Sequence, residues 1–321
     1  MSQIIQFAHS GLEWGADHVP RHSKQYLSVA GNPGWLQRSW TLRGAHGRKF
    51  VERSGKYVQQ LGGPAIPADP LYFWCEAEWA TMARPLVMPA NAGTGVYPQW
   101  LHKFYTNLPE RPIDGVNSDP YIFGKQFIYS NCKQDTVLCN TQICPGDLIL
   151  YGSVKRTGNK PRFMLDTVFV AGEHSCPMAG KTIDEICREC GDRVSESFVK
   201  AVLEQLKESG CGHNNNNGHG CSAGNNYTLY FGASFDEPWK EIFSFVPVKI
   251  PGLKKTARQE DCGYERLTFT TLPPALNGML NLNLAQGVRI VHNADSVHVW
   301  KEIVKFAIQQ GYVLGTYFKE P

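Results

Sequence analysis

Two glutamates and an aspartate are residues whose type and spacing could serve metal or acid–base chemistry. Glu76 and Glu78 lie two residues apart in an aromatic, strand-like run, so they share one strand face with Trp74. Two carboxylates about 7 Å apart along a strand could bind a divalent ion or divide into an acid and a base. Together with Asp166 and His102 they would form the site of a metal-dependent hydrolase or nuclease-like enzyme. The alternative interpretation is a solvated strand face beside an aromatic cluster.

Four cysteines have a spacing that could hold zinc. Cys187 and Cys190 form a C-x-x-C pair, and Cys211 and Cys221 follow in a stretch rich in asparagine. Four thiolates could form a tetrahedral structural zinc site, and His213 and His219 offer substitute ligands. The C-x-x-C pair also falls within a helical pattern, so the alternative is that Cys187 and Cys190 are small core residues on one helix face.

Aromatic and basic residues are interleaved through the first third of the chain. Aromatic rings stack on bases while lysine and arginine contact phosphates, which is how single-stranded or flipped nucleotides are commonly held. We predict that Tyr72 and Trp74 form a base pocket and that Asp166 or Glu76 accepts a hydrogen bond from a base edge. The predicted phosphate contacts are Arg48, Lys49 and Lys155. The alternative is an aromatic core with ordinary surface charge.

The elements that must position these residues are mostly strands. A β-hairpin is predicted from about Cys144 to Glu173, with a turn at Cys144–Asp147, a near-continuous apolar strand at Leu148–Tyr151 and a return strand at Phe163–Ala171. Simple alternation along the return strand places Asp166 on one face with Met164 and Val168, among apolar neighbours. Further strands are expected at Leu71–Glu78, Tyr121–Ser130, Tyr227–Gly232, Ile242–Val248 and Arg289–His292.

Helices are expected in two places. The pattern of Lys181–Ser209 is helical with a break at Gly191, and an asparagine-rich loop follows, so residues 181–226 form a helical, cysteine-containing insertion. A C-terminal helix is predicted from about Asp295 to Gln310, because Asp295 or Ser296 can cap its start and Gly311 ends it. The first 65 residues show poor periodicity.

Composition limits the class of protein. The 321 residues are 42% hydrophobic and only 19% charged, with 31 glycines and 20 prolines, which favours many short strands and irregular connections. The net charge of +3 does not by itself indicate nucleic-acid binding. The N-terminus has no signal-peptide pattern, no stretch is long enough to span a membrane, and ten cysteines are too few for a secreted disulfide scaffold. We therefore expect a cytoplasmic protein without a membrane partner.

These patterns predict an α+β fold. We expect a curled, mostly antiparallel sheet or small barrel with packed helices and a C-terminal helix, because the sequence has neither a repeating βαβ unit nor a glycine-rich phosphate loop. Residues 1–110 are interpreted as an aromatic and basic region packed on a barrel-like core formed by residues 111–321.

The hairpin carries a family resemblance. Pro145–Ser153 and Arg162–Glu173 resemble the central strands of PUA-like barrels of the EVE, ASCH and YTH type, in which a P-G-D turn opens a strand and the return strand ends in a valine-rich run with a glutamate. Three further segments look like bacterial nucleotide-modification-associated domain proteins; they are Phe73–Glu78, Phe243–Pro247 and Gln310–Gly315. The helical insertion after Glu173 departs from a minimal PUA-like barrel, so no binding residue is carried over.

The resemblance implies recognition of modified or flipped bases in DNA or RNA, in settings of DNA modification or antiviral defence. The leading hypothesis is therefore a nucleic-acid-binding or modified-base-sensing protein. Two alternatives remain open at this point: the metal-dependent hydrolase described above, and a protein-interaction subunit that meets a protein partner or forms a homo-oligomer. The sequence leaves open whether the protein is an enzyme.

Overall fold

The computed structural model describes residues 2–9, 13, 27–28, 36–37, 48–76, 81–87, 89, 96–104, 120–130, 141–157, 160–204, 228–250, 263–269, 272–284 and 286–321. Its strands are β1 (Ser2–Ala8), β2 (Leu27–Ser28), β3 (Leu36–Gln37), β4 (Lys49–Val58), β5 (Ala65–Cys75), β6 (Thr81–Pro85), β7 (Trp100–Phe104), β8 (Ile128–Tyr129), β9 (Leu148–Thr157), β10 (Lys160–Pro177), β11 (Thr228–Gly232), β12 (Val246–Lys249), β13 (Leu267–Phe269), β14 (Gly287–Ala294) and β15 (Val313–Phe318). Its helices are α2 (Ile183–Cys190), α3 (Glu196–Phe198) and α5 (Ser296–Gln309), with short helical turns η2 (Gly191–Arg193), η3 (Val199–Leu203) and η4 (Pro274–Leu276).

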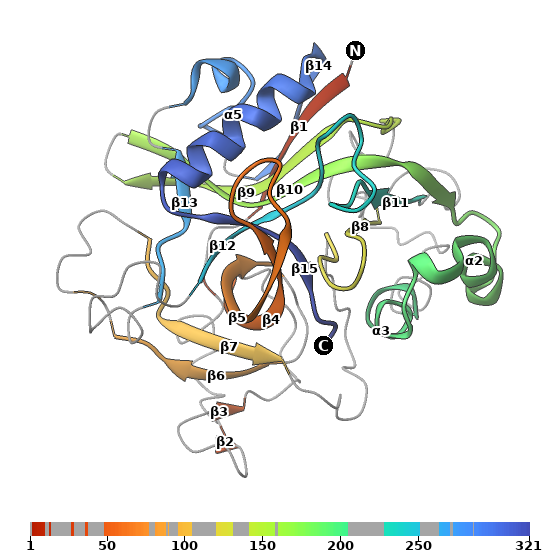
Figure 1. Ribbon diagram of the computed structural model, residues 1–321, viewed down its shortest axis with the longest axis horizontal. Helices are drawn as coiled ribbons and strands as arrows, with labels where there is room; N and C mark the ends of the chain where they lie inside the picture. The colour runs from red at the N-terminus through yellow and green to blue at the C-terminus, as the bar shows by residue number, and fades with distance from the viewer. Residues whose placement is uncertain are drawn as a thin grey trace, which may run out of the picture.

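Among the described residues the strands form two curled, mostly antiparallel sheets (Figure 1). The first sheet has the order β14-β1-β9-β10-β11-β8, with β13 also paired to β10. The second has the order β15-β12-β5-β4-β7-β6-β3-β2, and an additional pairing of β15 with β4 joins β4, β5, β12 and β15 into a closed ring of pairings. Only β1 with β9 and β4 with β7 run parallel within the part of the chain that is described. The mixed, strand-rich character predicted from the sequence is confirmed.

The predicted hairpin is confirmed as β9 and β10, and its first strand is buried on both faces as expected. Leu148 and Leu150 pack into one core cluster together with α5, while Ile149 and Tyr151 pack into a second cluster together with β4 and β5. This alternation follows from the two-residue period of a strand. The hairpin is therefore the layer between the C-terminal helix and the second sheet.

The return strand contains a β-bulge that the sequence analysis did not predict. Leu165 pairs with Gly152 and Thr167 pairs with Tyr151, so Asp166 has no partner of its own across the ladder. Simple alternation along Phe163–Ala171 is therefore wrong beyond this point: Phe163 and Leu165 lie in the same cluster as Val168. A bulge commonly re-aims one side chain, and here that side chain is the Asp166 carboxylate.

The Pro-Gly-Asp turn that opens the hairpin has a structural explanation. The Asp147 carboxylate is buried and accepts hydrogen bonds from the backbone N–H groups of Gln3 (2.7 Å) and Cys144 (2.8 Å). These bonds fasten the start of β1 to the start of β9, its parallel neighbour. Gly146 has φ +85°, and a Cβ atom there would lie 2.3 Å from the Trp239 ring, so both the turn and the close approach require glycine.

The C-terminal helix is confirmed as α5, which lies across the β9–β10 hairpin in Figure 1. The Asp295 side chain accepts a hydrogen bond from the N–H of His298 (3.0 Å), as a helix N-cap does. Trp300 is buried, and its indole N–H donates to the carbonyl of Phe243 (2.8 Å). The helix thus anchors the segment that leads into β12.

The predicted helical insertion is shorter and more irregular than expected. Its first helix, α2, begins with a capping box formed by Thr182 and Glu185, and Gly191 ends it, as the sequence indicated. After that break the described chain continues as η2, α3 and η3 rather than as one long helix. These elements lie beyond β11 at one end of the molecule (Figure 1).

Residues on both sides of position 110 contribute to both sheets. β1 pairs with β9 and β14, and β4 pairs with β15. The division of the chain into regions 1–110 and 111–321 stays a prediction. Within the described ranges, no helix combines the length and the apolar character needed to cross a lipid bilayer.

Candidate functional site

The aspartate at the bulge is held by an arginine from the chain segment before β13. Arg266 donates from its Nη2 atom to both carboxylate oxygens of Asp166 (2.6 and 2.7 Å) and from its Nε atom to one of them (3.0 Å). Arg266 also donates to the hydroxyl of Ser153 on β9 (2.8 Å). Asp166 and Arg266 are only 2% and 1% exposed, so this ion pair is fully inside the protein.

A second arginine, Arg48 just before β4, joins Asp166 to Glu76. Its Nε atom lies 3.0 Å from Asp166, and its Nη1 atom donates to Glu76. Its Nη2 atom donates to the carbonyl of Gly152, across the ladder from the bulge (2.8 Å). His9, at the end of β1, contacts the same Glu76 carboxylate through Nδ1 (2.5 Å). We call the group Arg48, Glu76, Asp166, Arg266 and His9 the ionic network.

Burial and neighbouring charges shift the pKa values of both arginines of the ionic network. Burial by itself lowers the pKa of Arg48, but Glu76 and Asp166 outweigh it and raise that pKa above its ordinary value. Burial lowers the pKa of Arg266, with Asp166 opposing the shift and Arg48 adding to it. Both guanidinium groups nevertheless stay charged. Two cations therefore face two carboxylates in a dry environment, and removing one member leaves another without compensation.

The structure thus brings Asp166, Glu76 and Trp74 into one neighbourhood, but not into an open pocket. The guanidinium carbon of Arg266 lies 5.5 Å from the centroid of the Trp74 ring, so the indole covers the network. Both oxygens of the Asp166 carboxylate contact arginines, and Oε2 of Glu76 contacts Arg48 and His9. A metal ion or a base edge would have to displace those contacts before it could bind any of these three oxygens.

The other predicted catalytic candidates lie elsewhere or outside the described residues. His102 is on β7, is buried, and its Nδ1 atom lies 2.9 Å from the hydroxyl of Thr81 on β6. Glu78 lies outside the described residues, because the described part of β5 ends at Cys75 and the chain is described only to residue 76 there. The hydrolase site formed by these residues stays a prediction.

The predicted base-stacking residues pack against the protein's own aromatic rings. Trp74 is 5% exposed, and its ring lies 5.6 Å from that of Phe50. The Tyr72 ring also stacks on the Phe50 ring, at 6.0 Å between centroids. The Trp74 indole N–H donates to the carbonyl of Tyr264 (3.1 Å). This arrangement fits the alternative of an aromatic core, since the Trp74 ring has little free face for a base.

The predicted phosphate contacts fall into two groups. Arg48 and Lys49 are 1% and 2% exposed, so a phosphate could reach them only if the surrounding chain opened. Lys155, near the end of β9, is exposed. Among the three predicted cations, only Lys155 therefore lies at the surface as a phosphate contact requires.

Of the four predicted zinc ligands, two are described. Cys187 and Cys190 lie on α2, and Cys190 is buried; Cys211 and Cys221 lie outside the described residues. Burial, with a hydrogen bond to Cys176, raises the pKa of Cys190 to about 12, so its thiolate is scarce. Cys176, at the end of β10, is a neighbour that the spacing did not indicate. Across the part of the chain that the structure describes, no three His, Cys, Asp or Glu side chains form a group that could hold a metal ion.

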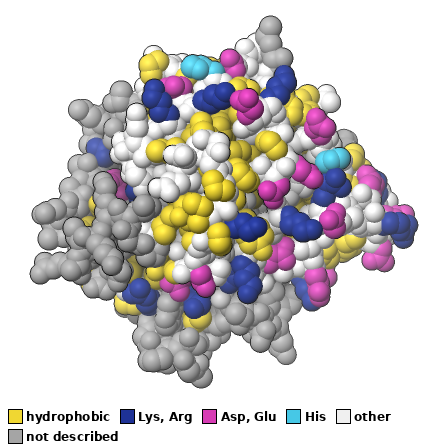
Figure 2. Space-filling model, viewed as in Figure 1, with side chains coloured by type: hydrophobic (Ala, Val, Ile, Leu, Met, Phe, Trp, Pro, Cys, Tyr) yellow, Lys and Arg dark blue, Asp and Glu magenta, His cyan; other side chains and the backbone are white. Residues whose placement is uncertain are grey.

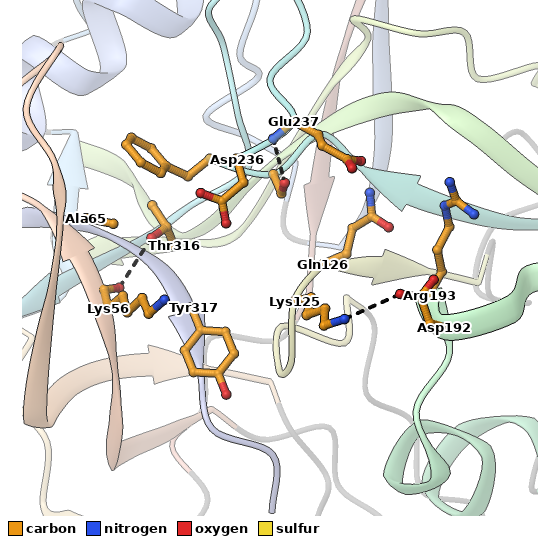
Figure 3. A pocket seen from close by; sticks show the side chains of 12 residues that line it. Lys56, Ala65, Lys125, Gln126, Asp192, Arg193, Asp236, Glu237, Thr316 and Tyr317 are labelled. Carbon is orange, nitrogen blue, oxygen red and sulfur yellow. Dashed lines mark hydrogen bonds and ion pairs between the residues drawn. The ribbon is translucent and has the colours of Figure 1, made fainter.

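An open pocket lies at the junction of the two sheets, and sequence reasoning missed it. Its volume is about 390 Å³. We call it the polar pocket; it is lined by Lys56, Ala65, Lys125, Gln126, Asp192, Arg193, Ser234, Phe235, Asp236, Glu237, Thr316 and Tyr317. Figure 3 shows these side chains converging from β4, β5, β15, η2, the segment before β8 and the loop after β11. The one local signal was the acidic turn Ser234–Glu237 directly after a predicted strand, but nothing in the sequence placed it beside Lys56 or Tyr317.

Comparisons with known proteins add no identification. No protein-family model, no curated protein and no solved structure matches this chain. The polar pocket and the ionic network are therefore the features that bear on its function.

Proposed function

We propose that this protein binds nucleic acid by holding an unstacked nucleotide in the polar pocket. The observation that carries the proposal is the convergence, in one open pocket, of two aromatic side chains, an amide and three cationic side chains. That combination suits a nucleotide, since aromatic rings stack on bases, amides bond their edges and cations contact phosphates. Neighbouring side chains pack against Trp74, where the sequence predicted a base pocket. We therefore place the base in the polar pocket instead.

The aromatic side chains of the polar pocket are partly exposed and are fixed by their neighbours. The ring of Phe235 meets that of Phe243 edge-on at 5.3 Å. The ammonium group of Lys56 lies 5.7 Å from the centroid of the Tyr317 ring. A ring that is held on one side and open on the other offers a stacking surface at little entropic cost.

The cations that would contact phosphates are accessible. Lys56 and Lys125 are exposed, and Arg193 is half-buried. Lys125 forms a surface ion pair with Asp192 at 3.4 Å. The lysine side chain is 80% exposed and the aspartate side chain 83%. Such exposed pairs are weak, so a phosphate can compete for the lysine.

The charge on the rest of the surface is mixed. Figure 2 shows Lys and Arg side chains interspersed with Asp and Glu on one face of the molecule, with apolar patches between them. With a net charge of only +3, long-range attraction to nucleic acid is weak. We therefore expect moderate affinity that depends on a few local contacts, and a preference for single strands or for bases that leave a duplex easily.

We further propose that the fold is PUA-like. The closed ring of β4, β5, β12 and β15 and the Pro-Gly-Asp turn support a PUA-like arrangement. A role in sensing modified bases, in DNA modification or antiviral defence, extends the proposal and rests on the resemblance of sequence alone. Action as a protein-interaction subunit or homo-oligomer is compatible with it and predicts a co-purifying chain.

Fluorescence anisotropy with labelled oligonucleotides tests the proposal. We expect single-stranded DNA or RNA to bind at micromolar protein, with affinity falling between about 50 and 200 mM salt because phosphate contacts release counterions. Substituting Lys56→Gln together with Lys125→Gln should weaken binding and reduce the salt dependence. Lys301→Gln, an exposed lysine on α5 that does not line the pocket, is the matched control. Absence of salt-sensitive binding to plain and modified oligonucleotides at micromolar protein would overturn the proposal.

A further inference from the structure

Acidic and basic side chains reach the polar pocket from different elements. Asp236 and Glu237 come from the loop after β11, whereas Lys56 comes from β4 and Lys125 from the segment before β8. In Figure 3 the Asp236 carboxylate hangs from its loop toward the side of the pocket on which Thr316, Lys56 and Tyr317 lie. The remaining lining carboxylate, Asp192, is paired with Lys125 at 3.4 Å. A ligand in the pocket can therefore offer hydrogen-bond donors to Asp236 and negative charge to the lysines.

The acidic loop is held in a fixed turn. The N–H of Ser234 donates to the carbonyl of Glu237 (3.2 Å), and the N–H of Glu237 donates back to the Ser234 hydroxyl (3.0 Å). On the strand side, the N–H of Ala233 donates to the carbonyl of Val170 in β10 (2.8 Å), which ties the loop to the central hairpin. Asp236 is thus presented at the tip of a pre-organised turn, and ordering it costs little on binding.

The Asp236 side chain is available to a ligand. Its carboxylate is exposed, and within the described residues it makes no hydrogen bond or ion pair. An ionised carboxylate only accepts hydrogen bonds. It therefore selects ligand groups that carry N–H or O–H donors and repels carbonyl oxygens.

We propose that the polar pocket selects nucleotides whose base carries an exocyclic amino group, with Asp236 accepting the amino hydrogens and Lys56 and Lys125 contacting the phosphate. The inference rests on the proposed function and names the ligand class of the same pocket. Cytosine, adenine and guanine each present an amino group, and carboxylates accept from such groups in base recognition. Uracil and thymine present N3–H only between two carbonyl oxygens, which a carboxylate repels.

The test compares short single-stranded oligo(dC) with oligo(dU), which are both pyrimidines and differ in the amino group. Wild-type protein should bind oligo(dC) about tenfold or more tightly than oligo(dU). Asp236→Asn should reduce that preference to about threefold or less, because an amide both donates and accepts and so tolerates uracil O4. Glu173→Gln removes an exposed carboxylate outside the pocket and should leave the preference unchanged. Far-UV circular dichroism confirms that each variant is folded.

The outcomes separate this inference from the proposed function. If neither oligonucleotide binds at micromolar protein, the proposed function fails and the inference fails with it. If both bind with salt-sensitive and equal affinity, or if Asp236→Asn keeps the full preference for oligo(dC), the inference is wrong while the proposed function stands.

Discussion

At the scale of single residues, Asp166 shows that the sequence could indicate a residue of interest but not its partner. Its place among apolar residues of the return strand marked it in the sequence as a candidate for catalysis or base contact, whereas the structure pairs it with Arg266. Its main partner, Arg266, is 100 residues away in the chain, and no local pattern encodes such a pairing. The bulge at Asp166 was equally invisible, because the residues around it alternate as an ordinary strand would.

The ionic network leads to a prediction about stability. Asp166→Asn should destabilise the protein by about 3–5 kcal/mol, because Arg266 and Arg48 would keep their charge inside the protein without compensation. Urea unfolding followed by circular dichroism measures the loss. Asp184→Asn, an exposed aspartate on α2, makes the same chemical change and should stay within about 0.5–1 kcal/mol of wild type. A loss below about 1 kcal/mol for Asp166→Asn would contradict the role assigned to the network.

The polar pocket shows why candidate ligand-binding residues were harder to predict than core residues. Its lining comes from six separate parts of the chain, and each contributes one to four residues of ordinary type. Trp74 and Tyr72 were conspicuous in the sequence because they are large and aromatic, yet large aromatic side chains are also what fill a core. The residues that line an open pocket are set by tertiary packing, which spacing along the chain does not reveal.

At the scale of elements, segments with strong local patterns were predicted correctly, whereas strands that form through tertiary pairing were missed. The β9–β10 hairpin and α5 were predicted because their apolar periodicity, turn and cap residues agree. β1, β4 and β15 were missed. Strand β4 reads as a basic segment, since Arg48 and Lys49 introduce it, and it becomes a strand by pairing with β5, β7 and β15.

The turn at the start of the hairpin gives a prediction with an internal control. Gly146→Ala should cost the positive-φ penalty of about 1–2 kcal/mol plus about 1–3 kcal/mol for the clash with Trp239. Gly180→Ala has a similar φ of +71° but no atom within 4 Å of the added Cβ, so it should cost only the positive-φ penalty. Thermal or urea unfolding of both variants measures the difference. In a Trp239→Ala background the two glycine substitutions should cost the same, and a difference that persists there would show that Trp239 is not its cause.

At the scale of the whole molecule, the two sheets are joined by more than contact between their faces. Val168 of β10 exchanges both backbone hydrogen bonds with Phe245, just before β12, at 2.9 Å each. The ionic network adds a second connection between the sheets, because Asp166 belongs to the first sheet and Arg48 directly precedes β4 of the second. A molecule joined in this way should unfold as one cooperative unit.

The same connectivity predicts what happens when the chain is cut near residue 110. A fragment of residues 111–321 lacks β1, which pairs with β9 and β14, and lacks β4 and β5, which close the ring with β12 and β15. It also leaves Asp166 and Arg266 without Arg48 and exposes long unpaired strand edges, which favour aggregation. We expect this fragment to show no cooperative urea transition by itself, and to recover one when mixed with residues 1–110. A cooperative transition and dispersed amide resonances in the fragment alone would instead establish residues 111–321 as an independent folding unit.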